Sequence, residues 1–258
     1  MDYTLYYKQA GISEDDDYNC HHSHDDSIEI IQVLQGTGSI MLGNRLGRFQ
    51  AGDVYIIDAN TVHATSPDDP EIYIRNKLLF SKMLLLRLLG RSIPSSLSLN
   101  CTPDEFARIS ATFASIHEKM ESNASNLLVL SKILMLLDIC FYSPNEHFIT
   151  NESLSAEVMD YIVKQLSSPL SLESIAKAMH ISKYYLCHCF KKETGMTLGT
   201  YIHTMRFSLA KQLLVSTNDS ITSIAATIGF NETAAFSKAF FKENKISPTA
   251  YRNMYKEH

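Results

Sequence analysis

The sequence has no apolar run long enough to cross a membrane and no secretory signal at its N-terminus. Its longest apolar stretches, Met83–Leu89 and Ile133–Leu137, are far shorter than a bilayer span requires. The first residues, Met1-Asp2-Tyr3-Thr4, contain neither the basic nor the apolar segment of a signal peptide. We therefore expect a soluble, cytoplasmic protein with no membrane partner.

Cysteine is scarce, and no Cys-x-x-Cys pair occurs. The five cysteines, from Cys20 to Cys189, are an odd number. This pattern argues against a disulfide framework and favours the reduced thiols of a cytosolic protein. With 45% hydrophobic and 20% charged residues, the chain has enough apolar material for ordinary cores without covalent or metal cross-links.

Positive charge is also scarce overall, but it is unevenly distributed. The formal net charge is −5 for 258 residues. Residues 1–150 carry 11 Lys and Arg against 19 Asp and Glu, whereas residues 151–258 carry 12 against 9. Such an asymmetry predicts two domains with different partners, of which only the C-terminal one is suited to nucleic acid.

The N-terminal part has a strand-like pattern from Ile28 to Ile74. We expect strands at Ile28–Leu34, Ser39–Leu42 and Val54–Ile57, with another beginning near Ile72–Ile74. Gly, Asn and Asp separate these segments. Short strands joined by such turns indicate an antiparallel barrel or jelly roll.

Two helices are expected after the strands, at Asp104–Glu121 and Asn126–Tyr142. The first places apolar residues on one face: Phe106, Ile109, Phe113, Ile116 and Met120. These helices either pack on the barrel or pair with a second subunit. The segment 144–152, which contains Pro144, is predicted to be the linker.

The remainder is predicted to be entirely helical. The expected helices are 154–166, 172–179, 183–193, 198–215, 221–228, 232–243 and 248–255. Helix-end signals support these limits: Ser171, Ser182 and Asn231 as N-caps, Gly195 after a helix end, and Pro248 in a first turn.

This helical part contains an internal repeat with an offset of 49 to 50 residues. Ser171–Ala176 is similar to Ser220–Ala225, and Phe190–Glu193 is similar to Phe240–Glu243. Each copy is a short helix, a tight turn and a second helix, the helix-turn-helix pattern. Gly229 in the second turn can adopt a positive φ, and His180 takes that place in the first.

A single helix over Thr197–Ser216 is predicted to connect the two copies. A helix of about 20 residues is roughly 30 Å long, and successive major grooves on one side of DNA are about 34 Å apart. The connector therefore suits two recognition helices in adjacent grooves. The alternative is a helical bundle with two similar hairpins.

Together these features resemble the double helix-turn-helix domain of the AraC/XylS transcription regulators. The resemblance rests on about 100 residues, notably Ile175-Ala176, Ser182–Leu186, Phe190–Gly195, Tyr201-Ile202, Arg206, Ala210, Leu213-Leu214, Ile224-Ala225, Gly229-Phe230, Phe236-Ser237, Phe240, Lys242, Ser247-Pro248 and Tyr251-Arg252. Thr197-Leu198 departs from the family pattern, which usually has a proline there, so helix initiation must depend on Thr197 as a cap.

The resemblance implies which residues face DNA. It places base contacts at Tyr184, Cys187 and His188 in the first unit, where histidine can donate to guanine. Lysines there are expected to contact phosphates, which position the protein without specifying sequence. The second unit has mostly small side chains, so weaker direct readout is expected. The full predicted set is Ser182, Lys183, Tyr184, Cys187, His188, Lys191, Lys192, Asn231, Thr233, Ser237, Lys238 and Lys242.

The N-terminal domain resembles the cupins, whose two motifs match His22, His24 and Glu29, and then His63. Residues two apart on a strand share a face, so this set is expected inside the barrel. Three imidazoles and a carboxylate would suit a transition metal. The preferred interpretation is instead an organic effector, a sugar or a carboxylate, contacted by His22, His24, Glu29, Tyr55, His63 and Arg75.

The combined prediction is an α+β protein. Residues 1–143 form a cupin-like effector-sensing and dimerisation domain, and residues 153–258 an all-α DNA-binding domain. The expected function is a transcription regulator, an activator rather than a repressor, that needs no cofactor and catalyses nothing. Its partners would be double-stranded DNA, an effector, a second copy through residues 104–142, and RNA polymerase. The alternatives are a metal-dependent cupin oxygenase or isomerase with a helical appendage, and an adaptor that binds another regulator.

Overall fold

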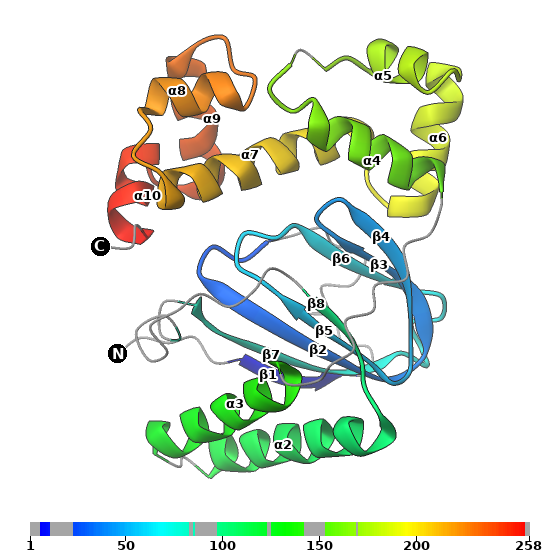
Figure 1. The fold of residues 1–258 in the computed structure, drawn as a ribbon, viewed down its shortest axis with the longest axis vertical. Coiled ribbons are helices and arrows are strands. Elements are labelled where there is room, and N and C mark those ends of the chain that lie inside the picture. Colours follow the sequence, from blue (N-terminus) through cyan, green and yellow to red (C-terminus); the bar gives the residue numbers. More distant parts are fainter. Residues whose placement is uncertain are drawn as a thin grey trace.

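The computed structural model describes residues 6–10, 23–82, 85, 97–122, 125–141, 153–168 and 170–255. It has an N-terminal β-domain, two helices against one face of it, and a C-terminal helical domain against the other side (Figure 1). The predicted α+β class is confirmed. His22 and the predicted linker 144–152 lie outside the described residues.

The described strands form two antiparallel sheets. One has the order β1-β7-β2-β5-β8 and the other the order β4-β3-β6. The strands are β1 (Tyr6–Ala10), β2 (Ser27–Gln35), β3 (Thr37–Leu42), β4 (Arg45–Gln50), β5 (Asp53–Ile57), β6 (His63–Pro67), β7 (Ile74–Ser81) and β8 (Leu97–Asn100). The sequence analysis predicted β2, β3 and β5 but missed β1, β4, β6 and β8, and it placed the start of β7 two residues early.

Strand β2 is buried on both faces, which explains its nearly continuous apolar sequence. Ile28 and Ile30 belong to the core beneath the helices, whereas Ile31 and Val33 belong to the core between the sheets. Such double-sided burial is typical of central strands and removes the polar alternation of a half-exposed strand. Glu29 shares the inner face with Ile31, although it is charged.

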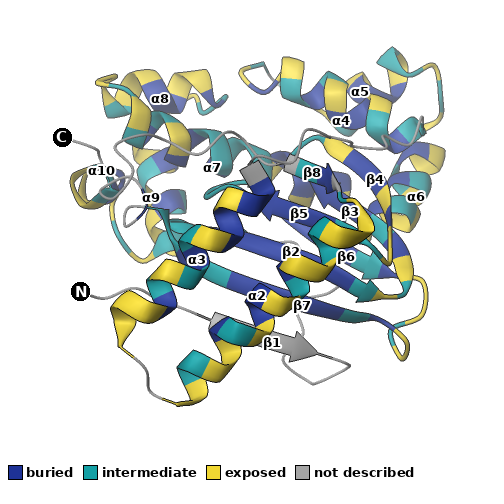
Figure 2. Ribbon diagram, turned by 60° about the horizontal axis from the view of Figure 1, so that its bottom comes forward, coloured by how far each residue is buried: buried dark blue, intermediate teal, exposed yellow. Residues whose placement is uncertain are grey.

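Helices α2 (Pro103–Glu121) and α3 (Asn126–Phe141) cover the outer face of the five-stranded sheet, where Figure 2 shows their buried sides against β2, β5 and β7. Thr102 and Glu105 form a capping box that starts α2. The predicted face of α2 packs as expected, with Ile109 and Phe113 completely buried. These helices therefore pack on their own β-domain.

The C-terminal helices agree closely with the predicted ranges. They are α4 (Leu154–Lys164), α5 (Leu172–Ala178), α6 (Lys183–Thr194), α7 (Leu198–Ser216), α8 (Ile221–Thr227), α9 (Thr233–Asn244) and α10 (Pro248–Tyr255). Ser171, Ser182 and Thr197 cap as predicted, and Gly195 ends α6 at φ 79°. The prediction of Asn231 as a cap is wrong: Glu232 is the N-cap of α9 and makes no side-chain cap hydrogen bond.

Each helix-turn-helix unit has its own core, but only the first core continues into the β-domain. Phe190 and Tyr201 share a cluster with Met41, Leu46 and Val62 of the β-domain. The second cluster, around Phe207, Phe236 and Phe240, consists of described residues of the helical domain alone. The first unit is therefore the one joined to the β-domain by apolar packing.

Two arginines occupy equivalent places in the two units. Arg206 on α7 donates to the carbonyls of Leu166 and Ser168, at 3.2 and 2.9 Å. Arg252 on α10 donates to the carbonyls of Leu214 and Asp219, at 3.1 and 2.6 Å. Each guanidinium thus donates hydrogen bonds to backbone carbonyls ahead of α5 or α8. These bonds fix the path of the chain where it enters that unit.

Candidate functional site

The outer face of α6 exposes aromatic, imidazole and thiol side chains. Leu186 and Phe190 face the core, whereas Tyr184 is 83% exposed. The rings of Tyr184 and His188, one turn apart, are stacked with centroids 6.2 Å apart and planes 9° from parallel. Cys187 lies half-buried beside them. This arrangement offers a rigid aromatic and imidazole surface that can contact base edges.

Helix α9 offers smaller side chains at the equivalent places. Lys238 and Lys242 are exposed, and Thr233 and Ser237 are half-buried. Asn231 is exposed in the turn before the helix and also lines a groove with Arg206, Gly229 and Phe230. The second face can thus contribute cations and hydroxyls, but it has no arginine or glutamine, and its asparagine lies in the turn before the helix.

The predicted phosphate contacts on α6 differ in their surroundings. Lys183 forms an ion pair with Glu173 on α5, with Nζ 2.5 Å from Oε1, and both side chains are mostly exposed. Lys191 and Lys192 are exposed near the end of the helix. Ser182 uses its hydroxyl to accept from the backbone N–H of Tyr185. Ser182 therefore orders the start of α6, and Lys183 must leave Glu173 to bind a phosphate.

The connector α7 has 19 residues, so it is about 28 Å long. Its two ends belong to different units, and its length is comparable to the 34 Å groove repeat. The turn before each recognition helix has a positive φ, at His180 (55°) and Gly229 (82°). A Cβ at Gly229 would lie 2.7 Å from a guanidinium nitrogen of Arg206, so both the positive φ and the close contact favour glycine there.

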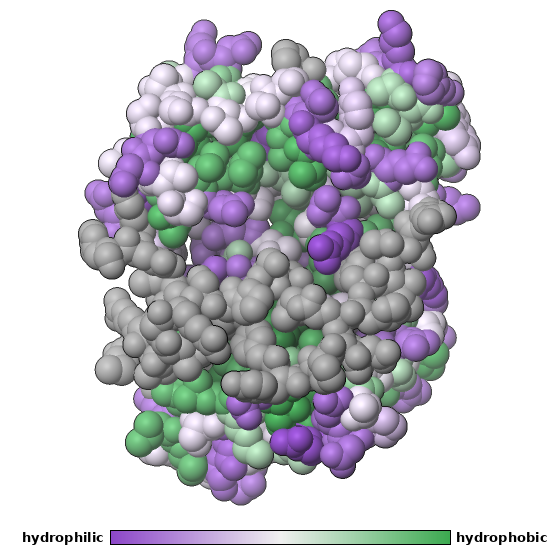
Figure 3. Space-filling view, viewed as in Figure 1, coloured by the Kyte–Doolittle hydropathy of each residue, from purple (hydrophilic) through white to green (hydrophobic). Residues whose placement is uncertain are grey.

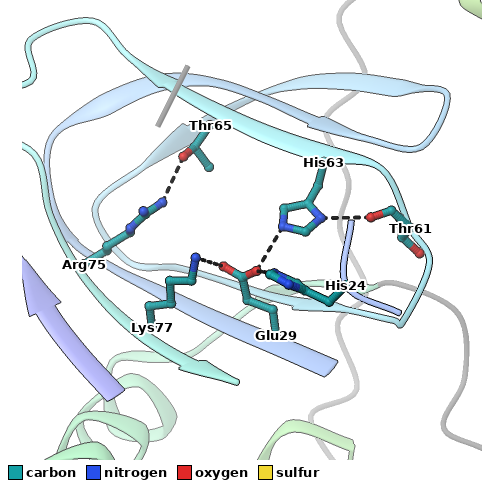
Figure 4. A network of polar contacts seen from close by, with 7 residues as sticks. All are labelled: His24, Glu29, Thr61, His63, Thr65, Arg75 and Lys77. Carbon is teal, nitrogen blue, oxygen red and sulfur yellow. Dashed lines mark hydrogen bonds and ion pairs between the residues drawn. The ribbon is translucent and has the colours of Figure 1, made fainter. Parts of the chain in front are cut away.

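The β-domain contains a polar cluster inside its otherwise apolar interior, shown in Figure 4. Glu29 Oε2 lies 2.8 Å from His24 Nε2 and 2.9 Å from His63 Nε2. Lys77 Nζ lies 3.3 Å from Glu29 Oε1. Glu29, His63 and Lys77 are each at most 5% exposed. We call these four residues the Glu29 cluster. His22, predicted to join them, lies outside the described residues.

Hydrogen bonds and nearby positive charges act on the Glu29 carboxyl group. Burial alone raises the pKa of Glu29, but hydrogen bonds from His24 and His63 and the charges of His63 and Lys77 outweigh burial and hold that pKa well below its usual value. His63 Nδ1 lies 2.9 Å from the Thr61 carbonyl, which can only accept, so Nδ1 carries a hydrogen.

The predicted residues Arg75 and Tyr55 also face the interior. Arg75 is 4% exposed, donates to Thr65 Oγ1 at 2.9 Å and lies over the ring of Tyr73. The hydroxyl of Tyr55 donates to Asp53 at 3.1 Å, and burial raises the pKa of Tyr55. Prediction missed Lys77, whose pairing with Ile31 places it on the same face as Arg75.

The same cluster contains the donors that a metal ion would need. Ligand atoms of His24, Glu29 and His63 all lie within 4.8 Å of one another. Two imidazoles and a carboxylate fit a divalent transition metal, and Thr61 orients His63 as an outer partner would. Lys77 is unfavourable for such an ion, because its ammonium already neutralises Glu29. The cluster is therefore better suited to binding through hydrogen bonds.

Comparisons with known proteins match both parts of the chain. The AraC-like ligand binding domain family matches residues 7–137, and a helix-turn-helix domain family matches residues 175–254. Among the described residues, no helix is both long and apolar enough to cross a membrane.

Relatives with known roles match over most of their length. The chain is 25% identical to the lactose operon transcription activator of Staphylococcus xylosus, over 86% of this chain and 82% of that protein. It is 29% identical to the transcriptional activator RhaR of Pectobacterium carotovorum, over 90% and 86%. The C-terminal domain of AraT from Geobacillus stearothermophilus is 33% identical over 40% of this chain and 85% of that one, with a TM-score of 0.38. The chain belongs to the AraC family of transcription regulators.

Proposed function

We propose that this protein is a transcription activator that binds DNA through α6 and α9 and responds to a small molecule bound in the β-domain. One observation carries the proposal: two recognition helices with open outer faces are joined by one helix of 19 residues. That connector brings the two faces close to the spacing of adjacent major grooves. Such a protein acts in the cytoplasm on double-stranded DNA and, as an activator, with RNA polymerase.

The two units contribute differently to recognition. Tyr184, Cys187 and His188 read bases, whereas Lys191 and Lys192 contact phosphates beside them. In the second unit, Lys238 and Lys242 contact phosphates, while Asn231, Thr233 and Ser237 make short polar contacts. Sequence preference therefore comes mainly from the first half-site.

The effector binds between the two sheets, at the Glu29 cluster and Arg75. Carboxylate, imidazole and ammonium groups there can donate to and accept from the hydroxyls of a sugar, and Arg75 can bind a carboxylate. The name of the lactose operon transcription activator agrees with a sugar. His22 belongs to the proposed contact set by its place in the sequence.

A second copy of the chain pairs through α2 and α3. On the solvent side of α3, Leu127 is 77% exposed and Met135 48%. Figure 3 shows hydrophobic surface at this end of the molecule. Large apolar side chains that remain exposed on an otherwise packed helix are candidates for an interface between subunits.

Titration of the purified protein onto its own upstream DNA, against a scrambled duplex at two salt concentrations, tests the proposal. We expect preference for the natural sequence and weaker binding at higher salt, because phosphate contacts release counterions. Absence of preference, with and without a panel of sugars, would contradict it. A stoichiometric metal in the purified protein would favour the cupin enzyme instead.

A further inference from the structure

A groove crosses α7 between the two helix-turn-helix units, on the side of the helix turned away from the β-domain. Ser208 and Lys211 on α7 bond to the β-domain. Gly199, His203 and Arg206 line the groove and, at spacings of four and three residues, share the other face of α7. In Figure 1, α5 and α8 lie above α7 and the β-domain lies below it. The groove is therefore separate from the interior of the β-domain.

The walls of this groove are largely apolar and come from both units. Two adjoining hollows of about 240 and 400 Å³ share Leu170, Arg206 and Phe230, so they form one groove. Its apolar lining residues are Leu170 and Leu172 at the start of the first unit, Ile202 and Phe207 on α7, and Phe230 in the turn of the second unit. Figure 3 shows hydrophobic surface between the two units. We call this feature the inter-unit groove. Its size is in the range of a site for a small molecule, roughly 300–1,000 Å³.

Arg206 provides a fixed cation in the inter-unit groove. Its Nε and Nη2 donate to the carbonyls of Leu166 and Ser168, at 3.2 and 2.9 Å, which hold the side chain in place. The remaining nitrogen, Nη1, makes no hydrogen bond with the described residues, and none of their carboxylates pairs with Arg206. Burial lowers the pKa of Arg206, because the guanidinium is partly withdrawn from water. An anion at Nη1 would gain a charge-assisted hydrogen bond from a donor that is already ordered.

The rest of the groove favours a flat apolar body over a second anionic group. The ring of His203 stacks on Phe207 with centroids 4.5 Å apart, and Phe230 meets Phe207 edge-on at 6.0 Å. His203 Nδ1 lies 3.7 Å from Glu243 Oε2 on α9. The Glu243 carboxylate would repel another anion beside His203. The arrangement therefore suits one anionic group at Arg206 and an aromatic ring along the apolar wall.

We propose that the inter-unit groove binds a small aromatic carboxylate, with the carboxylate at Arg206 Nη1 and the ring against Ile202 and Phe230. This site is additional to the effector site proposed in the β-domain, and it does not depend on that site. Because both units contribute lining residues, a bound molecule would contact both and fix their relative position.

Gly199 provides the most direct test. It is exposed near the start of α7, and a Cβ built on it meets nothing within 4 Å. Gly199→Phe should therefore fill the groove without disturbing the core, and Gly199→Ala is the matched control because it adds only the Cβ. Calorimetric titration of the full-length protein with 2-naphthoate should show at least about tenfold weaker binding for Gly199→Phe and unchanged binding for Gly199→Ala.

The role of charge is tested with a second probe. 2-Naphthamide has the same ring system without the charge, so it should bind the wild-type protein about tenfold more weakly than 2-naphthoate. Arg206→Met should remove this difference between the two probes. The ratio of the two affinities reports on the Arg206 contact, whereas a general loosening of the domain would weaken both probes alike.

Four results would overturn the proposal. The first is absence of 2-naphthoate binding to the wild-type protein, and the second is equal affinity of the wild-type protein for the two probes. The third is binding that Gly199→Phe retains but Arg75→Met loses, which would place the probe inside the β-domain. The fourth is unchanged probe binding with weaker DNA binding in Gly199→Phe, which would assign the groove to the DNA backbone.

Discussion

The two helix-turn-helix units have nearly the same interior but very different outer faces. Leu186 and Phe190 in the first unit, and Phe236 and Phe240 in the second, are almost completely buried. The outer positions diverge: Tyr184, Cys187 and His188 in the first unit are replaced by Ala234, Ser237 and Lys238 in the second. The comparison shows that packing preserves the repeat, whereas recognition is set by residues that the core does not constrain.

The largest expected effect is a loss of stability when the interior that the two units have in common is disturbed. Phe190→Ala and Phe240→Ala each leave a cavity and should lower the free energy of unfolding by about 3–5 kcal/mol, measured by chemical denaturation. Only the first unit shares its core with Met41 and Leu46. Phe190→Ala should therefore also loosen the β-domain, seen as faster hydrogen exchange in β3 and β4. Equal exchange in both variants would show that the two cores are equally independent.

The next largest effect is on DNA binding, when residues on the divergent outer faces are replaced. His188→Ala should weaken specific DNA binding by about 1–3 kcal/mol and relax preference at one base pair. Lys238→Ala, at the equivalent place in α9, should weaken binding to all sequences and reduce the salt slope by about 1. Titrations against single-base variants of the site measure both. Loss of base preference in the Lys238→Ala variant would reverse the assigned roles.

A smaller effect tests whether the second unit can be made more similar to the first. Phe241 is 56% exposed at the place that Lys191 occupies in α6. Phe241→Lys should add one phosphate contact, increasing the salt slope by about 0.9 and the affinity a few-fold at low salt. Lys191→Phe is the reciprocal control and should do the opposite. An unchanged slope in both variants would place this position away from DNA.

The smallest effect concerns the ends of the recognition helices. Helix α6 ends at Gly195, whereas α9 ends at Lys245 with φ 64°, a conformation that favours glycine. Lys245→Gly should stabilise the protein by about 0.5–1 kcal/mol. Gly195→Lys should destabilise it by a similar amount. Thermal unfolding measures both, and destabilisation by Lys245→Gly would show that the Lys245 side chain matters more than its backbone.

The helical domain could be predicted from sequence because its signals are local. Ser171 and Ser182 accept cap hydrogen bonds from residues three positions later, and Gly195 follows directly after a helix. Asn231 was assigned wrongly because it is a good capping residue next to the true cap, Glu232. Amino-acid type alone does not show which of two neighbouring residues is the N-cap.

The β-domain was less predictable because its partners are distant in sequence. Strands β4 and β6 contain Gly47 and Pro67, and both owe their pairing to β3. Lys77 follows Asn76 and precedes an apolar run, so only its register opposite Ile31 places it beside Glu29. The contact of Asp25 with Lys211 joins residues 186 positions apart, which no local pattern indicates.

Because both faces of strand β2 are buried, its two sets of residues can change independently during evolution. Residues 29, 31 and 33 face the space between the sheets, and residues 28 and 30 face α2 and α3. Substitutions at the first set can change ligand chemistry without touching the helices, and substitutions at the second can change the helices without touching the ligand. A single inserted or deleted residue would exchange the two sets at once. Relatives that sense different molecules should therefore differ in the residues of β2 and conserve its length.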